Sequence, residues 1–324
     1  MEPGEAADLV RPRLGISACL TGERVRYDGG HKHDPFLTQT LGRFVEWVPV
    51  CPEVECGLGV PRESMRLEGD VSAPRLVTHR TKTDLTERML EWAARRVEEL
   101  APLDLHGFVF KSKSPSSGLH RVPVYAADGM PAREGRGLFA AAFVRRFPLL
   151  PVEEEGRLND PRLRENFIER VFAWRRWLET TQSEPAANGL VRFHTAHKLS
   201  LLAHSTEHYR RLGRIVAGAG AEPWEDVSGR YIALFMEGMQ VLATPGKHAN
   251  VLQHLMGYLK RDLDGEDKAE LLEVIEEYRL GRLPLIVPIT LLKHHLRRRP
   301  VPEWVYRQVY LNPYPAELLL RNHA

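Results

Sequence analysis

The chain has 324 residues, of which 43% are hydrophobic and 27% are charged, and its formal net charge is +2 at pH 7. This composition is typical of a globular protein long enough for two domains, and it excludes a disordered or fibrous chain. Because the charge is nearly balanced, no overall field draws the chain to nucleic acid or to a membrane, so any basic surface must be local.

The sequence carries no obvious targeting or membrane segment. Its first ten residues, "MEPGEAADLV", have neither a basic nor an apolar leader region, and the apolar stretch Leu283–Leu292 is too short to span a bilayer. Three cysteines do not indicate a disulfide framework and favour a reducing compartment. We therefore expect a cytoplasmic protein with no membrane partner, and no obligate protein partner is evident.

The first half of the chain alternates strand-like and helix-like segments. Short β-rich runs cover Arg13–Ala18, Val45–Val50 and Gly107–Ser112, and an amphipathic helical pattern covers Leu85–Leu100. Strand, helix and strand at such intervals predict an α/β fold, here a three-layer domain with a mostly parallel sheet over residues 1–158.

From Asn159 onward the pattern is helical. The segment Asp160–Glu179 begins with an Asp cap and a proline at its first helical position, and Thr180–Gly189 has the composition of a polar linker. Amphipathic segments then follow over Leu190–Ala217, Glu225–Ala243, Ala249–Lys260, Glu266–Leu280 and Ile286–Arg298. We expect a connecting helix and linker over residues 159–188 and an all-α domain over residues 189–324.

All three cysteines follow predicted strands. Cys19 comes after the first strand and Cys51 after the second, with Cys56 in the same loop. Ligands of an open α/β sheet bind outside the carboxyl ends of its strands, and three thiolates there suit a soft metal centre. Such a centre would keep one coordination position open, as a catalytic metal requires. The alternative is three unrelated buried cysteines that act as small apolar side chains.

The loop Lys111–Ser117 follows the third strand and is rich in lysine and serine. Its hydroxyl and backbone N–H groups would suit an anion or a substrate carbonyl, although a solvated turn has the same composition.

Three motifs together resemble the thiouracil desulfidase (TudS) family: "ISACLTGERVRYDGGHK", "PVCPEVECGLGVPRE" and "KSKSPSSG". The part from Leu190 on resembles the YbgA family through "HTAHKLSLLAHS", "HANVLQHLMGYL", "YRLGRLPLIVP" and "LKHHL". The two in one chain are similar to the fused two-domain desulfidase (RudS) group, which removes sulfur from 4-thiouridine in tRNA.

The resemblance implies a 4Fe-4S cluster held by Cys19, Cys51 and Cys56, with one iron that has no protein ligand. The stand-alone family reads SPSC where this chain has Ser116 and Ser117, and it lacks the second cysteine of "CPEVEC". One ligand therefore differs in position between the two groups.

The resemblance also implies roles for two residues in these motifs. Glu53 would deprotonate a water molecule that attacks the carbon bearing sulfur, and Ser114 would protonate the ring or stabilise its charge. Glu55 is expected to face solvent. Further substrate contacts are expected from Arg26, Asp28 and Lys111, and in the helical domain from Lys198, His204, His248, His254 and Lys293.

Two other interpretations of the helical domain remain. The spacing of His197, His204 and His208 predicts one shared helix face, and such a face can bind zinc. Basic residues there, among them Arg210, Arg211 and Arg297–Arg299, would instead bind the phosphates of tRNA. The alternatives to a tRNA desulfidase are an enzyme for free thiolated bases or nucleosides only, and a non-enzymatic cluster-bearing RNA-binding protein.

Overall fold

The computed structural model describes residues 11–126 and 129–323. The first ten residues, in which we see no leader, lie outside this range. The chain folds into two compact units that divide between Asn159 and Asp160. The helix that we expected to connect two domains therefore belongs to the second unit.

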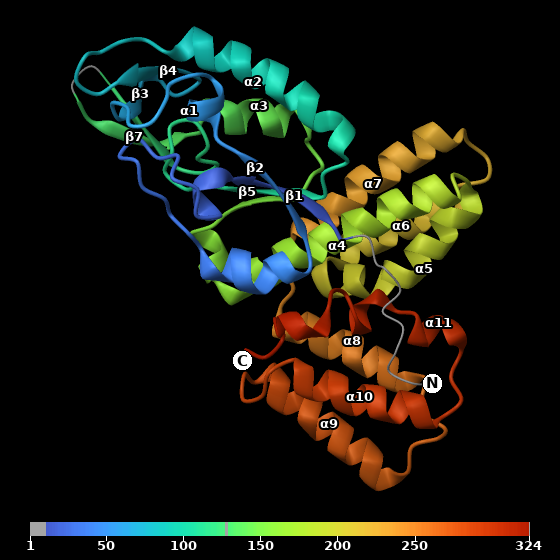
Figure 1. Cartoon of the computed structure of the whole chain (residues 1–324). Helices are drawn as coiled ribbons and strands as arrows, with labels where there is room; N and C mark the ends of the chain where they lie inside the picture. Colours follow the sequence, from blue (N-terminus) through green and yellow to red (C-terminus); the bar gives the residue numbers. More distant parts are fainter. Residues whose placement is uncertain (1–10, 127–128, 324) are drawn as a thin grey trace. The chain divides into compact units, whose positions relative to one another are not determined.

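The first unit is built on a four-stranded parallel sheet in the order β2-β1-β5-β8 (Figure 1). Its strands are β1 (Arg13–Ser17), β2 (Glu46–Val50), β5 (Gly107–Phe110) and β8 (Val152–Glu154). Each neighbouring pair is parallel. The predicted strands and the mostly parallel sheet are thus confirmed.

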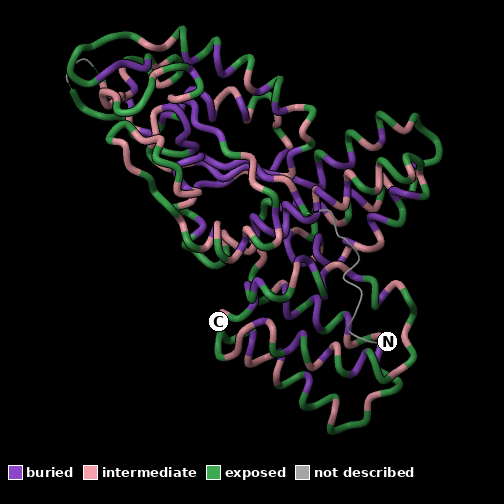
Figure 2. The backbone as a smooth tube through the Cα atoms, viewed as in Figure 1, coloured by how far each residue is buried: buried purple, intermediate pink, exposed green. Residues whose placement is uncertain are grey.

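Helices α2 (Thr86–Leu100) and α3 (Leu138–Arg146) cover one face of this sheet (Figure 1). The rings of Phe108 and Phe143 lie 4.7 Å apart, and that of Phe139 packs against both. Gly15 in β1 leaves room for this cluster, since a Cβ atom there would lie 2.1 Å from the Phe108 ring. Figure 2 shows the strands buried along their length.

A second sheet, in the order β4-β3-β6-β7, was not predicted. Its strands are β3 (Met65–Asp70), β4 (Ala73–Thr78), β6 (Val122–Tyr125) and β7 (Pro131–Gly135). Only one face is strongly apolar: Leu67 and Leu76 are buried, whereas Arg66 and Glu68 form a salt bridge. The charged residues between the apolar ones hide the short alternation from sequence analysis.

The first unit also contains short helical pieces that carry loops of the site. These are α1 (Pro52–Glu55), a π-helical turn at Phe36–Thr40, and 3-10 turns at Ala18–Leu20, Leu41–Arg43, Ala101–Leu103 and Arg157–Asn159.

The second unit is helical, as predicted. Its longer helices are α4 (Pro161–Ser183), α5 (Ala187–His204), α6 (Thr206–Ala217), α7 (Trp224–Gln240), α8 (Pro245–Gly257), α9 (Gly265–Arg279) and α10 (Ile286–Arg298). The short helix α11 (Glu303–Tyr306) and 3-10 turns at Val309–Leu311 and Ala316–Leu318 follow. Leu252, Leu255 and Leu292 are at the centre of a core formed with residues of α5, α8, α9 and α10. None of the helices in the described ranges is both long and apolar enough to cross a membrane.

Two expectations about the helical unit were wrong. The polar stretch Thr180–Gly189 is not a linker, because α4 continues to Ser183 and α5 begins at Ala187. The Thr180 hydroxyl donates to the Arg176 carbonyl (2.8 Å), so this polar residue stays in the helix. Conversely, Leu190–Ala217 is not one segment, since the chain turns at Ser205, whose side chain caps α6.

Candidate functional site

A cavity of about 370 Å³ opens at the carboxyl ends of β1, β2 and β5. Cys19 follows β1, Cys51 follows β2, and the Lys111–Ser114 stretch follows β5; all of these residues line the cavity. Because β1 is the neighbour of both β2 and β5, the three loops meet at one edge of the sheet. The site thus lies where parallel sheets bind their ligands.

The three thiols surround Glu53 without forming a tight cluster. Each cysteine is 8% exposed. The Cys51 thiol donates to Oε2 of Glu53 over 3.5 Å, and the Cys56 thiol donates to the Glu53 backbone carbonyl over 3.3 Å. Cys19 and Cys51 line the cavity, whereas Cys56, at the end of α1, does not.

Burial dominates the titration of these thiols. Desolvation raises the pKa of Cys19 to about 11 and that of Cys51 to about 12, and it also raises the pKa of Cys56. Lys111 partly opposes the shift at Cys19, and Glu53 adds to it at all three cysteines. Without a cation the thiols are therefore protonated at neutral pH, and a protonated thiol is a weak nucleophile and a weak metal ligand.

The geometry separates two kinds of metal centre. A single zinc ion binds each sulfur at roughly 2.3 Å and would hold the ligand atoms close to one another. Within residues 11–126 and 129–323, no group of three or more His, Cys, Asp or Glu side chains is arranged to hold one metal ion. A cluster, in which each thiolate binds a different iron, needs more widely spaced sulfurs. The donor set thus fits a cluster better than a single ion.

The charge of the cavity also fits an anionic group. Its lining contains one carboxylate, Glu53, and five cationic side chains, those of Arg26, Lys32, Arg62, Lys111 and Lys113. This excess of positive charge would offset thiolates and would attract an anionic substrate group such as a phosphate.

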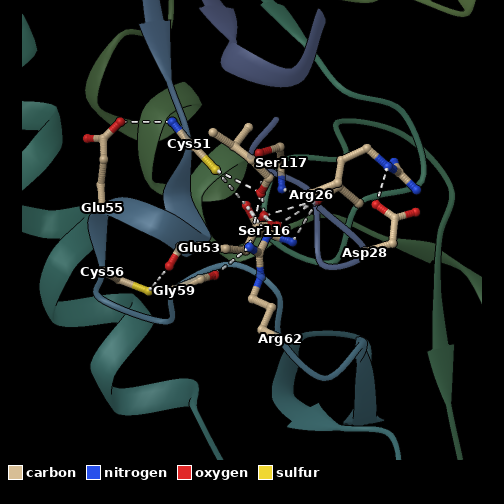
Figure 3. Close-up of polar contacts among 12 residues, drawn as sticks. Arg26, Asp28, Cys51, Glu53, Glu55, Cys56, Gly59, Arg62, Ser116 and Ser117 are labelled. Atoms are coloured by element: carbon tan, nitrogen blue, oxygen red, sulfur yellow. Dashed lines mark hydrogen bonds and ion pairs between the residues drawn. The ribbon is translucent and has the colours of Figure 1, made fainter. Parts of the chain in front are cut away.

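Glu53 is the most connected polar side chain of the cavity (Figure 3). Its Oε1 accepts hydrogen bonds from Ser116 at 2.6 Å and Ser114 at 3.5 Å. Its Oε2 lies 3.8 Å from Nη2 of Arg62. Its side chain remains 13% exposed. The carboxylate is therefore fixed in place and still reachable from the cavity.

Sequence analysis proposed Ser114 and overlooked Ser116. The Ser114 hydroxyl oxygen accepts from the backbone N–H groups of Ser116 (3.3 Å) and Ser117 (3.1 Å), so this side chain shapes the loop. Ser116 is the closer partner of Glu53 and is 0% exposed. The motif offered three serines, and only the curl of the loop decides which of them reaches the carboxylate. Ser117 lines the cavity.

Two carboxylates of β8 and the loop after it anchor this serine loop, and neither was predicted. Glu155 accepts hydrogen bonds from Ser112 N (2.6 Å) and the Ser112 hydroxyl (2.8 Å), and it forms a salt bridge with Lys111. Glu154 accepts from Leu119 N (2.7 Å) at the far end of the loop. Lys111 therefore faces the cavity with its charge already paired.

The other proposed contacts of this unit differ in position. Arg26 lines the cavity, but Asp28 does not; Asp28 accepts from Gly30 N (3.0 Å) and lies 3.5 Å from Arg26. Glu55 is exposed, points away from Glu53 in Figure 3, and accepts from Cys51 N at 2.8 Å. Arg62 was not predicted, although it holds the loop through the carbonyls of Val25 and Gly59.

The proposed contacts of the helical unit do not form one site. His204 and His248 line a second cavity of about 220 Å³, which Lys198, His254 and Lys293 do not line. Lys198 lies 3.5 Å from the Trp304 ring centroid, and Lys293 donates to Asn312 over 2.7 Å. His254 is exposed.

The zinc interpretation of the helical histidines is wrong for the described residues. The turn at Ser205 puts His208 on α6, whereas His197 and His204 are on α5. The ring of His197 stacks on that of Phe193, with 4.0 Å between centroids, and Nδ1 contacts the Phe193 carbonyl. His197 is thus a core residue.

Comparison with known proteins divides the chain in the same two parts. Residues 14–155 match the family described as 2-thiouracil desulfurase, and residues 198–315 match a family of unknown function, DUF1722. The first match contains all three cysteines, Glu53 and the serine loop.

Individual relatives cover one part each. The uncharacterized protein YbgA of Escherichia coli is 29% identical over 168 residues, which are 51% of this chain and 98% of YbgA. The uncharacterized protein YbbK of Bacillus subtilis is 27% identical over 108 residues, 32% of this chain and 71% of YbbK. A solved structure of the [4Fe-4S]-dependent thiouracil desulfidase TudS covers 46% of this chain and 95% of its own, with 28% identity and a TM-score of 0.39.

Proposed function

Because the chain joins a 2-thiouracil desulfurase domain to a DUF1722 (YbgA-like) domain, we propose that it is an iron–sulfur-dependent desulfidase that removes sulfur from 4-thiouridine in tRNA. The products are uridine in the RNA and sulfide. The reaction exchanges a C=S bond for a C=O bond with water as the oxygen donor, so it needs no external oxidant or reductant.

The observation that carries the proposal is the position of Glu53. Its carboxylate stands in the cavity, held by Ser116 at 2.6 Å and flanked by the thiols of Cys51 and Cys56. A carboxylate fixed beside soft ligands suits a hydrolytic reaction at a carbon that carries sulfur.

Each side chain then has a defined task. Glu53 accepts a proton from a water molecule, whose oxygen attacks C4 of the thiolated ring. The Ser114 hydroxyl, which is 3.0 Å from that of Ser116, supplies a hydrogen bond to the charge that develops on the ring. Arg62 and Ser116 keep the Glu53 carboxylate oriented. The C–S bond breaks, and the sulfur leaves as hydrogen sulfide after it takes up a proton.

The proposed cofactor is a 4Fe-4S cluster held by Cys19, Cys51 and Cys56. When bound, an iron without a protein ligand supplies a thiophilic Lewis acid for the departing sulfur. Buried thiols and an excess of cationic side chains support this assignment. The cluster would also lower the pKa of the three thiols, which burial raises in its absence.

We assign tRNA recognition to the helical unit, on the strength of its resemblance to the second half of fused tRNA desulfidases. The exposed Arg297 and Arg298 at the end of α10 are available for phosphate contacts. A second candidate is an enzyme for free thiolated nucleosides, which the five cationic side chains of the cavity favour because they suit a nucleotide phosphate.

Anaerobic rate measurements on thiolated tRNA, 4-thiouridine and 4-thiouracil separate these candidates. We expect kcat/KM to be highest for tRNA and to fall steeply with salt, because each neutralised phosphate releases counterions. Arg297→Ala and Arg298→Ala should weaken this salt dependence for tRNA and leave the rate with 4-thiouracil unchanged. Equal salt dependence for all three substrates would favour the nucleoside enzyme, and no turnover of any would refute both.

A further inference from the structure

The second cavity, within the helical unit, contains polar groups that the fold leaves without partners. It is lined by residues of α4, α5 and α8 and by Arg321 near the end of the chain, and its volume is about 220 Å³. A pocket smaller than roughly 300 Å³ suits a ligand of a few ring atoms rather than a drug-sized molecule.

Two buried charged side chains face this cavity with one atom free. Glu169 is 4% exposed; its Oε2 lies 3.2 Å from Nε2 of His204, but its Oε1 has no hydrogen-bond partner in the described structure. Arg321 is 5% exposed; Nε donates to Glu165 (2.8 Å) and Nη1 to the Tyr310 carbonyl (2.7 Å), but Nη2 has no partner there. An unpaired buried acceptor and an unpaired buried donor each carry a free-energy cost that a ligand would remove.

The charges of the cavity select a neutral ligand. Its lining contains two arginines and two glutamates, Arg162, Arg321, Glu165 and Glu169. Burial lowers the pKa of His248, another lining residue, to about 3, so this ring is neutral. A phosphate would need an excess of positive charge, which the cavity lacks. In the described chain no set of side chains is arranged to hold a metal ion here.

The walls of the cavity suit a flat ligand. The rings of His248 and Tyr278 both line it, and they meet edge to face with their centroids 6.1 Å apart. Such a wall offers an aromatic surface beside the free acceptor and donor.

We propose that this cavity binds one nucleobase with a ring N–H next to a carbonyl, as in uracil and guanine. Glu169 accepts a hydrogen bond from the ring N–H, and Arg321 donates one to the carbonyl oxygen. Cytosine and adenine lack this neutral N–H and carbonyl pair and bind less well. The choice of a nucleobase among flat amide-like ligands rests on the proposed function; the choice of donor and acceptor does not. The base comes either from a free nucleoside or from an unpaired nucleotide of RNA.

Photocrosslinking to the full-length protein tests this proposal. One sample contains 5-bromouridine, and another contains an RNA oligonucleotide with a single unpaired 5-bromouridine; after irradiation, mass spectrometry locates the modified peptide. We expect a crosslink at His248 or Tyr278, which uridine suppresses and cytidine at the same concentration does not. Crosslinking by the free nucleoside identifies a nucleoside site, and crosslinking only by the oligonucleotide identifies a site for an RNA base.

Variants locate the contact. Glu169→Gln removes the anionic acceptor and Ala243→Phe fills the cavity, so each should lower this crosslink at least ~10-fold, the loss expected for one hydrogen bond to a charged group. Glu179→Gln, on the same helix but exposed, is the matched control. If either variant fails to fold, the uridine and cytidine competition on the unaltered protein still decides.

No crosslink in this cavity from either probe, or equal suppression by cytidine and uridine, would overturn the proposal. Desulfurisation of 4-thiouridine is measured separately. An active enzyme without the crosslink refutes this inference alone, and an inactive protein with the crosslink refutes the proposed function alone.

Discussion

The hydroxyl of Ser116 lies 2.6 Å from Oε1 of Glu53 and donates a hydrogen bond to it, across 63 positions of sequence. This contact joins the loop after β5 to the loop after β2. It fixes the direction of the carboxylate from a residue that is itself inaccessible to substrate. Ser116 is therefore a positioning residue, and Glu53 is the group that meets the substrate.

Ser116→Ala should lower kcat by roughly 10-fold, because the loss of one hydrogen bond leaves Glu53 free to turn away from the reacting water. KM and iron content should change little, since Ser116 does not line the cavity. Ser72→Ala, at an exposed turn, is the control. Steady-state kinetics with 4-thiouracil checks the prediction, and an unchanged kcat would show that Ser116 has no part in orienting Glu53.

Glu53→Gln should keep the cluster and lower turnover by about 100-fold or more, because the amide cannot accept a proton from water. Glu55→Gln is the matched control: it has the same chemistry two residues away, but Glu55 faces Cys51 N and Arg96 outside the cavity. Single-turnover rates and iron content of both variants provide the measurement. Inactive Glu55→Gln with active Glu53→Gln would mean that the base is misassigned.

Replacing any one of the three cysteines with serine should remove the cluster from anaerobically purified protein, which should otherwise contain about four irons per chain. Cys56 is the sharpest case because it does not line the cavity, whereas Ser117 does. Ser117 also occupies the position at which the stand-alone desulfidases are expected to have a cysteine.

We therefore expect Cys56→Ser to lose iron and the double variant Cys56→Ser/Ser117→Cys to regain it. Iron and sulfide analysis, with the absorbance of the cluster, decides the outcome. Full iron content in Cys56→Ser alone would remove Cys56 from the ligand set, and a colourless wild-type protein with one zinc would exclude the cluster.

Sequence patterns predicted the elements whose apolar residues repeat regularly. The strands at Arg13 and Gly107 and the helix ending at Leu100 are buried on faces that their spacing predicts. The second sheet was missed because strands such as β3 and β4 are short and carry charges between single leucines. The break at Ser205 was missed because a helix cap inside an amphipathic pattern has no effect on the pattern itself.

The candidate site was predictable in its residue types and not in its contacts. Cys19, Cys51 and Glu53 follow from strand ends and motif. Ser116, Arg62 and Glu155 enter through loop geometry over 63, 9 and 43 residues of separation from their partners. No local spacing rule encodes contacts of that kind, because they depend on how separate loops meet above the sheet.

The helical unit should lose stability as the pH falls from 7.5 to 5. Burial lowers the pKa of His197 and His248 to about 3, so the folded chain keeps these rings neutral while the unfolded chain protonates them below pH 6.5. The unfolded state then binds more protons, and each histidine costs about 2 kcal/mol of stability at pH 5.

Denaturant titrations at the two pH values, followed by helix circular dichroism, check this dependence. His197→Gln should flatten it, even if the variant is less stable at pH 7.5, and the exposed His254→Gln should not. Equal pH dependence of the wild type and His197→Gln would contradict the assignment of a neutral buried imidazole.

The measurement that tests the central claim most directly is a product balance on tRNA that contains 4-thiouridine. The anaerobic protein is incubated with this tRNA in water enriched in oxygen-18, with no electron donor present. We predict one sulfide released for each 4-thiouridine lost, and uridine that carries one oxygen-18 atom. Glu53→Gln should give neither product at a comparable rate. Intact 4-thiouridine, a requirement for added reductant, or uridine without the heavy oxygen would contradict a hydrolytic tRNA desulfidase.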